Sequence, residues 1–214
     1  MPMQDVNPDL LLSTTRAVRK RLDLERPVPQ ELLLECLELA VQAPSGSNRQ
    51  AWRFLFLTQR EPKRLVAEYY SLAYDSSQQA PWPSYPEGDV RGQRQPKVIE
   101  SSDYLRDHLH EVPAMLLACR EGRLPENASA MRLATFYGSI LPAWSFMLAA
   151  RARGLGTAFT TTHLDYEREV AQALYIPFDH YTQVALVPIG FVKGEDLKPA
   201  ARIPLDTIVR WERW

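Results

Sequence analysis

Cysteine and glycine are both scarce in this sequence. Its 214 residues include two cysteines, Cys36 and Cys119, and nine glycines. Both cysteines stand among leucines and lack the spacing of a metal site, so we expect two buried thiols in a reducing compartment. The histidines, at positions 108, 110, 163 and 180, form no HExxH or similar signature. These absences argue against a disulfide scaffold and against a bound metal.

Strong net charge and long apolar runs are missing as well. The formal net charge is −1 and the pI is near 6.4, which disfavours a nucleic-acid partner. No uninterrupted apolar run approaches the ~18 residues needed to span a bilayer. Residues 1–16 lack the basic and apolar regions of a signal peptide. We therefore expect a cytoplasmic protein with no membrane partner.

Hydrophobic periodicity predicts a mixture of helices and strands. Helices are predicted over residues 29–43, 61–77 and 168–176, strands over residues 53–57, 113–120 and 181–192, and an extended tail after residue 192. The elements follow one another without a regular βαβ rhythm. We therefore expect a single α+β domain over residues 1–214.

Two further segments are marked by proline. Residues 128–153 are apolar nearly all round, which predicts a buried helix that Pro142 kinks or splits. Residues 80–97 are rich in proline and glycine, which argues against a regular helix or strand there. The length of this second segment, with its Trp82 and Tyr85, suggests a flap over a substrate site.

A dense basic cluster precedes the first long helix. Arg16, Arg19, Lys20 and Arg21 lie within six residues. An arginine fork matches the oxygens of a phosphate, and charge-assisted bonds to phosphate are strong. The cluster is therefore either a phosphate site or a solvated basic patch. A nucleic-acid arm is disfavoured, because no aromatic residues are interleaved.

The loop APSGSNRQAWRF, residues 43–54, is dense in hydrogen-bonding groups. Its serine, asparagine and glutamine side chains can bond the rim of a heteroaromatic ligand, and Trp52 can wall a flat one. By itself the composition of the stretch favours a plain turn over a binding loop. The chain has no nucleophile elbow and no P-loop, and the GLG at 154–156 is not a GxGxxG. Binding groups without an acid–base motif suggest that a cofactor supplies the chemistry.

Taken in order, four motifs resemble the flavin-dependent nitroreductase family. They are the arginine-rich opening with its PVP and the Pro-Ser…Asn-x-Gln-x-Trp loop, both within residues 15–57, the central helix with its GLG exit at 138–159, and the final strand and tail at 185–214. The resemblance covers nearly the whole chain apart from about residues 60–112. It implies a nitroreductase-like fold, in which helices flank a central, mostly antiparallel sheet and two chains intertwine as a homodimer. It also implies FMN as cofactor and NADPH or NADH as electron donor.

The resemblance further implies which residues bind FMN. Arg16 and Arg202 would hold its phosphate. Arg19 would lie near the pyrimidine end of the ring, where negative charge develops on reduction. Thr160 and Thr161 would pass close to the reactive edge. The full set of expected cofactor-binding residues is Arg16, Ala17, Val18, Arg19, Lys20, Pro44, Ser45, Gly46, Ser47, Asn48, Gln50, Thr157, Thr160, Thr161 and Arg202.

This chain departs from the family pattern at two places. Ala17 stands where the family commonly has a serine whose hydroxyl bonds the phosphate, and a lost bond of that kind is worth about 0.5–1.5 kcal/mol. Residues 160–164 read TTTHL where the best-known branch has Pro-x-Glu-Gly. Nitro-compound reduction is therefore not assumed to be the native reaction. Ser45 is expected to reach the cofactor from the partner subunit.

The expected activity is ping-pong transfer of hydride from NAD(P)H to a flat acceptor, which is a nitroaromatic, a quinone or an enone. No side chain is needed as a nucleophile, and Trp82 and Tyr85 would contact substrate from the flap. A donor carrying a 2′-phosphate would favour an arginine within reach, for which Arg91 and Arg94 are candidates. One alternative is a specialised branch of the family that carries out reductive dehalogenation or flavin fragmentation. The other is a protein that binds FMN as a carrier or sensor and does not turn over.

Overall fold

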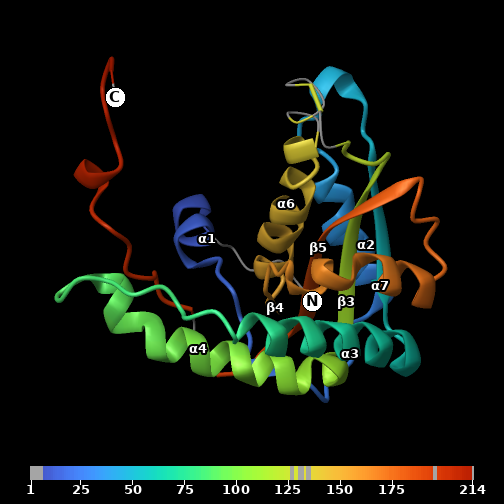
Figure 1. The fold of residues 1–214 in the computed structure, drawn as a ribbon, viewed down its shortest axis with the longest axis horizontal. Helices are drawn as coiled ribbons and strands as arrows, with labels where there is room; N and C mark the ends of the chain where they lie inside the picture. Colours follow the sequence, from blue (N-terminus) through green and yellow to red (C-terminus); the bar gives the residue numbers. More distant parts are fainter. Residues whose placement is uncertain (1–6, 126–127, 130–132, 134–135, 195–196, 214) are drawn as a thin grey trace.

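An antiparallel sheet forms the centre of the protein (Figure 1). The computed structural model describes residues 7–125, 128–129, 133, 136–194 and 197–213. Its strands are β1 (Leu22–Asp23), β2 (Trp52–Leu57), β3 (Ala114–Glu121), β4 (Leu155–Thr157) and β5 (Tyr181–Val192). They run in the order β1-β5-β3-β2, with β4 also paired to β5, and every pairing is antiparallel. The three predicted strands are confirmed as β2, β3 and β5.

Helices cover both faces of the sheet. They are α1 (Pro8–Thr14), α2 (Gln30–Ala40), α3 (Arg60–Ser77), α4 (Val90–His108), α6 (Leu141–Arg151) and α7 (Glu167–Ala173), with short 3-10 turns η1 (Gly46–Asn48), η2 (Leu109–Glu111), η3 (Thr162–Tyr166) and η4 (Leu205–Thr207). Successive side chains of a strand point to opposite faces. Accordingly Met115 and Leu117 of β3 pack in a core with α3, α4 and α7, whereas Ala114 and Leu116 pack with α2 and α6.

The helices predicted from periodicity are confirmed as α2, α3 and α7, with ends that differ by a few residues. The apolar stretch 128–153 does not form one straight helix in its described part. The chain turns at residues 139–140, and α6 begins at Leu141 with Pro142 in its first turn, where a missing N–H costs nothing. The split predicted at Pro142 is therefore confirmed, while residues 130–132 and 134–135 lie outside the described residues.

The expectation of an irregular segment over residues 80–97 is wrong for its second half. The helix α4 begins at Val90 and contains Pro96. The carboxylate of Asp89 caps this helix by accepting from the main-chain N–H two residues on, at 2.8 Å. Pro96 removes one intrahelical hydrogen bond, but α4 continues for further turns and buries Leu105 in the core. Packing of the long helix thus outweighs the local cost of the proline.

At Gly156, the backbone of β4 lies close to the side chains of Val18 and Leu22. A Cβ at Gly156 would lie 2.9 Å from Cγ1 of Val18 and 3.0 Å from Cδ2 of Leu22. We expect Gly156→Ala to lower the free energy of unfolding by about 1–3 kcal/mol, as overpacking does. Urea unfolding measures this. The control is Gly138→Ala, where an added Cβ meets no atom within 4 Å, and equal losses in both variants would contradict the steric argument.

Candidate functional site

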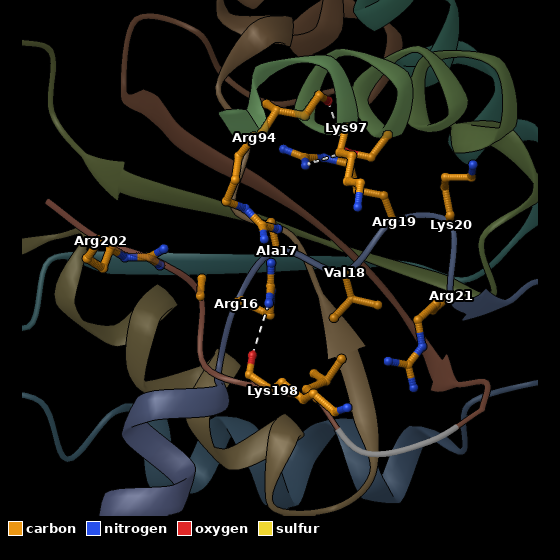
Figure 2. A pocket seen from close by; sticks show the side chains of 14 residues that line it. Arg16, Ala17, Val18, Arg19, Lys20, Arg21, Arg94, Lys97, Lys198 and Arg202 are labelled. Atoms are coloured by element: carbon orange, nitrogen blue, oxygen red, sulfur yellow. Dashed lines mark hydrogen bonds between the residues drawn. The ribbon is translucent and has the colours of Figure 1, made fainter. Parts of the chain in front are cut away.

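A cavity of about 630 Å³ opens between the basic segment of residues 16–21, α4 and the C-terminal tail (Figure 2). Its lining includes eight cationic side chains, which are Arg16, Arg19, Lys20, Arg21, Arg94, Lys97, Lys198 and Arg202. No acidic residue lines it within the described part of the chain. This lining favours an anionic ligand, and we call the space the cationic cavity.

The basic segment reaches the cavity because it lies in extended form beside β4. Ala17 forms an isolated parallel bridge with Thr157, and the N–H of Val18 donates to the carbonyl of Thr157 at 2.8 Å. Val18 is 5% exposed and anchors the segment in the core. Its neighbours Arg16 and Arg19 are only partly buried and line the cavity.

Like charges crowd around Arg16. Its Nη1 donates to the carbonyl oxygen of Lys198 at 3.0 Å, which joins two ends of the chain. Burial lowers the pKa of Arg16, and the nearby cations Arg94, Arg202 and Arg21 lower it further. Protonated arginines that repel one another in a partly buried site are stabilised by a bound anion.

Arg19 lies at the junction with a second cavity, of about 300 Å³, which it also lines. Its Nη1 donates to Oγ of Ser101 on α4 at 3.1 Å. Burial lowers the pKa of Arg19, and the neighbouring hydroxyls of Tyr70 and Tyr74 partly oppose that shift. We call this second space the tyrosine cavity.

Hydroxyl groups dominate the polar lining of the tyrosine cavity. Oγ1 of Thr160 lies 3.5 Å from the hydroxyl of Tyr70 and 3.3 Å from Oγ1 of Thr162. The hydroxyl of Tyr74 donates to Oδ1 of Asp103 at 2.8 Å, and burial, with this bond, raises the pKa of Tyr74. Hydroxyl groups such as these can donate or relay hydrogen bonds to a ligand.

The fold brings together eight of the seventeen predicted cofactor and flap residues, from distant parts of the sequence, in the lining of the two cavities. Those that line the cationic cavity are Arg16, Ala17, Val18, Arg19, Lys20 and Arg202. Thr160 and Trp82 line the tyrosine cavity. Thr157 is buried and adjoins the site through its carbonyl. Thr161 and Tyr85 line neither cavity, and the Tyr85 ring packs under the guanidinium of Arg91, 4.5 Å from its centroid.

The polar loop after α2 does not join this site within one chain. Its predicted residues are Pro44, Ser45, Gly46, Ser47, Asn48 and Gln50, and none of them lines either cavity. The loop lies at the upper end of the molecule in Figure 1, away from α4. Three residues of the loop have left-handed φ angles, Ser47, Asn48 and Gln50, and the N–H of Gln50 donates to Oγ of Ser45 at 3.1 Å. The expectation that Ser45 reaches the cofactor from the partner subunit stays a prediction.

Several groups that line the cavities were not predicted from the sequence. Lys97, Lys198 and Ser101 line the cationic cavity, and Tyr70 and Tyr74 line the other. Lys97 and Ser101 lie on α4, and the sequence pattern predicted no helix between residues 78 and 127, so their common helical face was not predicted either. Helical spacing read across Pro96 would have been the signal.

The two cysteines lie in the protein interior and not at the candidate site. Cys36 and Cys119 are buried and unpaired, as expected, and burial raises the pKa of Cys36 to about 11 and that of Cys119 to about 12. Both are therefore protonated at neutral pH and poor nucleophiles. In the described ranges, no group of three or more His, Cys, Asp or Glu residues is placed to hold a metal ion.

The helices were also compared with the length and hydropathy of a membrane span. None of those in the described part of the chain is both long and apolar enough to cross a membrane.

Comparison with known proteins agrees with this arrangement. The profile of the nitroreductase family matches residues 12–191. The Bacillus subtilis protein YodC, which carries the name of an NAD(P)H nitroreductase, is 29% identical over 205 residues, covering 92% of this chain and 95% of its own. An iodotyrosine deiodinase of Thermotoga neapolitana is 30% identical over 192 residues, covering 88% and 89%. The chain therefore belongs to the nitroreductase family and is an FMN-dependent oxidoreductase of that family.

Solved structures share the fold. An iodotyrosine deiodinase bound to FMN and 3-iodo-L-tyrosine matches with a TM-score of 0.70 at 22% identity, over 95% of this chain and 98% of the other. The FMN and NADPH-dependent nitroreductase NfnB from sphigopyxis sp. strain HMH matches with a TM-score of 0.69 at 20% identity, over 98% and 100%. The expected nitroreductase-like fold of the single chain, a mostly antiparallel sheet flanked by helices, is thereby confirmed.

Proposed function

We propose that this chain takes hydride from NADPH or NADH and reduces a flat electron acceptor, a nitroaromatic, quinone or enone. The observation that supports it best is the cationic cavity, where the N-terminal basic segment and the C-terminal tail meet beside β4. When bound, FMN supplies the two-electron chemistry, and the protein supplies binding and orientation. We further propose that residues 1–214 form one FMN-binding domain.

The residues of the cavity fit a phosphate-bearing cofactor. Arg16 and Arg202 would hold the phosphate, because both line the cavity. Burial and repulsion from nearby cations, Arg202 among them, lower the pKa of Arg16, and a bound anion would relieve that repulsion. Arg19 is placed between the two cavities, where it would stabilise negative charge that develops on reduction. Ala17 provides no hydroxyl, so the neighbouring cations would take up the phosphate oxygens that a serine contacts elsewhere in the family.

We propose that the working form is a homodimer. Large apolar side chains are exposed on separate elements, including Leu10 and Leu12 of α1, Trp144 of α6 and Trp211 of the tail, which is 83% exposed. The tail runs away from the body in Figure 1. Burial of these side chains against a second copy would remove their apolar area from water, and a second copy would also bring the loop of residues 44–50 to the cofactor.

Reductive dehalogenation is a second candidate. It is favoured by the iodotyrosine deiodinase of Thermotoga neapolitana, at 30% identity over most of both chains. The residues Thr160 and Thr162 also place hydroxyls in the tyrosine cavity, in the segment where this chain departs from the best-known branch. The two candidates are separated by iodide release from 3-iodo-L-tyrosine.

An anaerobic visible spectrum tests the proposal. Purified protein is mixed with FMN, desalted, and measured before and after addition of NADPH and, in a second sample, NADH. We expect retained yellow colour that one or both nucleotides bleach, and colour that returns on addition of 4-nitrobenzoate or a quinone. Retained flavin that neither nucleotide bleaches would indicate a carrier or sensor. Protein that retains no flavin would contradict the proposal.

A further inference from the structure

The cationic cavity carries more positive charge than a cofactor phosphate neutralises. A phosphate monoester bears about −1.5 to −2 at neutral pH. Of the eight cationic lining side chains, Lys20 is paired with the carboxylate of Glu100 at 2.5 Å. Nε of Arg21 donates to the carbonyl of Lys193 at 2.7 Å, a bond that holds this side chain but leaves its charge in place. Six further cations remain, and no acidic residue of the described chain lines the cavity between them. A second anion would relieve the surplus.

The surplus is concentrated on one helix. Arg94 and Lys97 are three residues apart on α4, so they share a face of the helix, and both line the cavity. Figure 2 shows both side chains beside the arginines of the basic segment. No hydrogen bond or ion pair engages either side chain within the described residues. The pKa of Glu100 is lowered mainly by Lys20 and also by Lys97, so one carboxylate is shared between these two lysines. Arg94 is close enough to lower the pKa of Arg16.

Arg91, one turn earlier on the same helix, is placed differently. Its Nη2 lies 2.7 Å from Oδ2 of Asp89, and its guanidinium stacks on the ring of Tyr85. It does not line the cavity. Of the two arginines suggested for an anionic donor group, the structure thus favours Arg94.

We propose that Arg94 and Lys97 form a second anion subsite, which binds a carboxylate or phosphate of the ligand that exchanges electrons with the cofactor. This proposal rests on the proposed function, because it assigns the cavity's first anion to FMN. The two sources of the second anion are a carboxylate on the acceptor and the 2′-phosphate of NADPH. Charge-assisted bonds to two cations would make either group a determinant of selectivity.

The test compares the double variant Arg94→Gln/Lys97→Gln with the matched control Arg91→Gln. Flavin content after desalting is read from the visible spectrum. Calorimetric titration then measures affinity for two ligand pairs that differ by one anionic group. These pairs are 4-nitrobenzoate with 4-nitrobenzamide, and NADP⁺ with NAD⁺.

We expect the double variant to lose at least about tenfold in affinity for 4-nitrobenzoate, NADP⁺ or both, a loss typical of charge-assisted bonds. The affinities for 4-nitrobenzamide and NAD⁺, which lack the anionic group in question, should be unchanged. The flavin content should be unchanged as well. The charged ligand that is affected identifies the source of the anion, and Arg91→Gln should behave as wild type.

Two results would overturn the subsite. In one, the double variant has a lower flavin content, but the ratio of its affinities for the two ligands of each pair is the same as in wild type. That result would assign the α4 cations to the FMN phosphate. The other is unchanged affinity for all four ligands. If wild-type protein retains no flavin, the proposed function fails, but the same titrations on that protein still decide whether Arg94 and Lys97 bind the anionic group.

Discussion

Replacing Arg202 by alanine is expected to lower the affinity for FMN about ten- to a hundredfold while the melting temperature of the apoprotein stays unchanged. The Arg202 side chain is exposed and lines the cationic cavity. Among the described residues, its hydrogen bond is the one that Nη1 donates to the carbonyl of the adjacent Ala201, at 3.1 Å, so the described fold gains little from it. A hydrogen bond to a charged group is worth about 1.5–3 kcal/mol, which corresponds to the expected range of affinity.

Fluorescence titration of apoprotein with FMN measures the first effect, and thermal unfolding without FMN measures the second. Arg210→Ala is the matched control, because Arg210 is also an exposed arginine of the tail but does not line the cavity. If Arg202→Ala lowered melting temperature and FMN affinity together, Arg202 would be a structural residue. If it changed neither, the phosphate would lie elsewhere.

Acidification is expected to destabilise the fold through His163. This side chain has no exposed surface, and neither ring nitrogen has a hydrogen-bond partner in the described part of the protein. Burial lowers the pKa of His163 from 6.5 to about 4. Below pH 6.5 the unfolded chain therefore binds a proton that the folded chain does not. Stability falls from pH 6.5 to about pH 4, by roughly 3 kcal/mol in total.

Urea unfolding at pH 7, 6, 5 and 4, at one protein concentration, measures this loss. His163→Leu removes the buried base, so the decline between pH 6.5 and 4 should become shallower by about 3 kcal/mol. His180→Gln, which replaces an exposed histidine, should keep the wild-type profile. A wild-type profile in His163→Leu as well would assign the acid lability to other groups.

Local patterns in the sequence determined much of the secondary structure. Apolar spacing predicted α2 and α3, and the buried runs predicted β3 and β5, because both sheet faces are covered. The sequence also indicated the basic cluster from Arg16 to Arg21 and the arginine of the tail, Arg202, because these charged residues stand next to small and apolar ones. These features depend on neighbouring residues only, so the sequence carries them directly.

The tertiary structure alone decided which of these groups meet. Arg16 contacts the carbonyl of Lys198, 182 residues away, a contact that no local pattern contains. Packing of α4 against the core outweighed the cost of Pro96, and this placed Arg94 and Lys97 on the cavity wall. The loop of residues 44–50, next to a core helix in sequence, lies away from the cavity, because the strand order of the sheet separates them. Local preference thus determined the elements, and long-range packing determined the site.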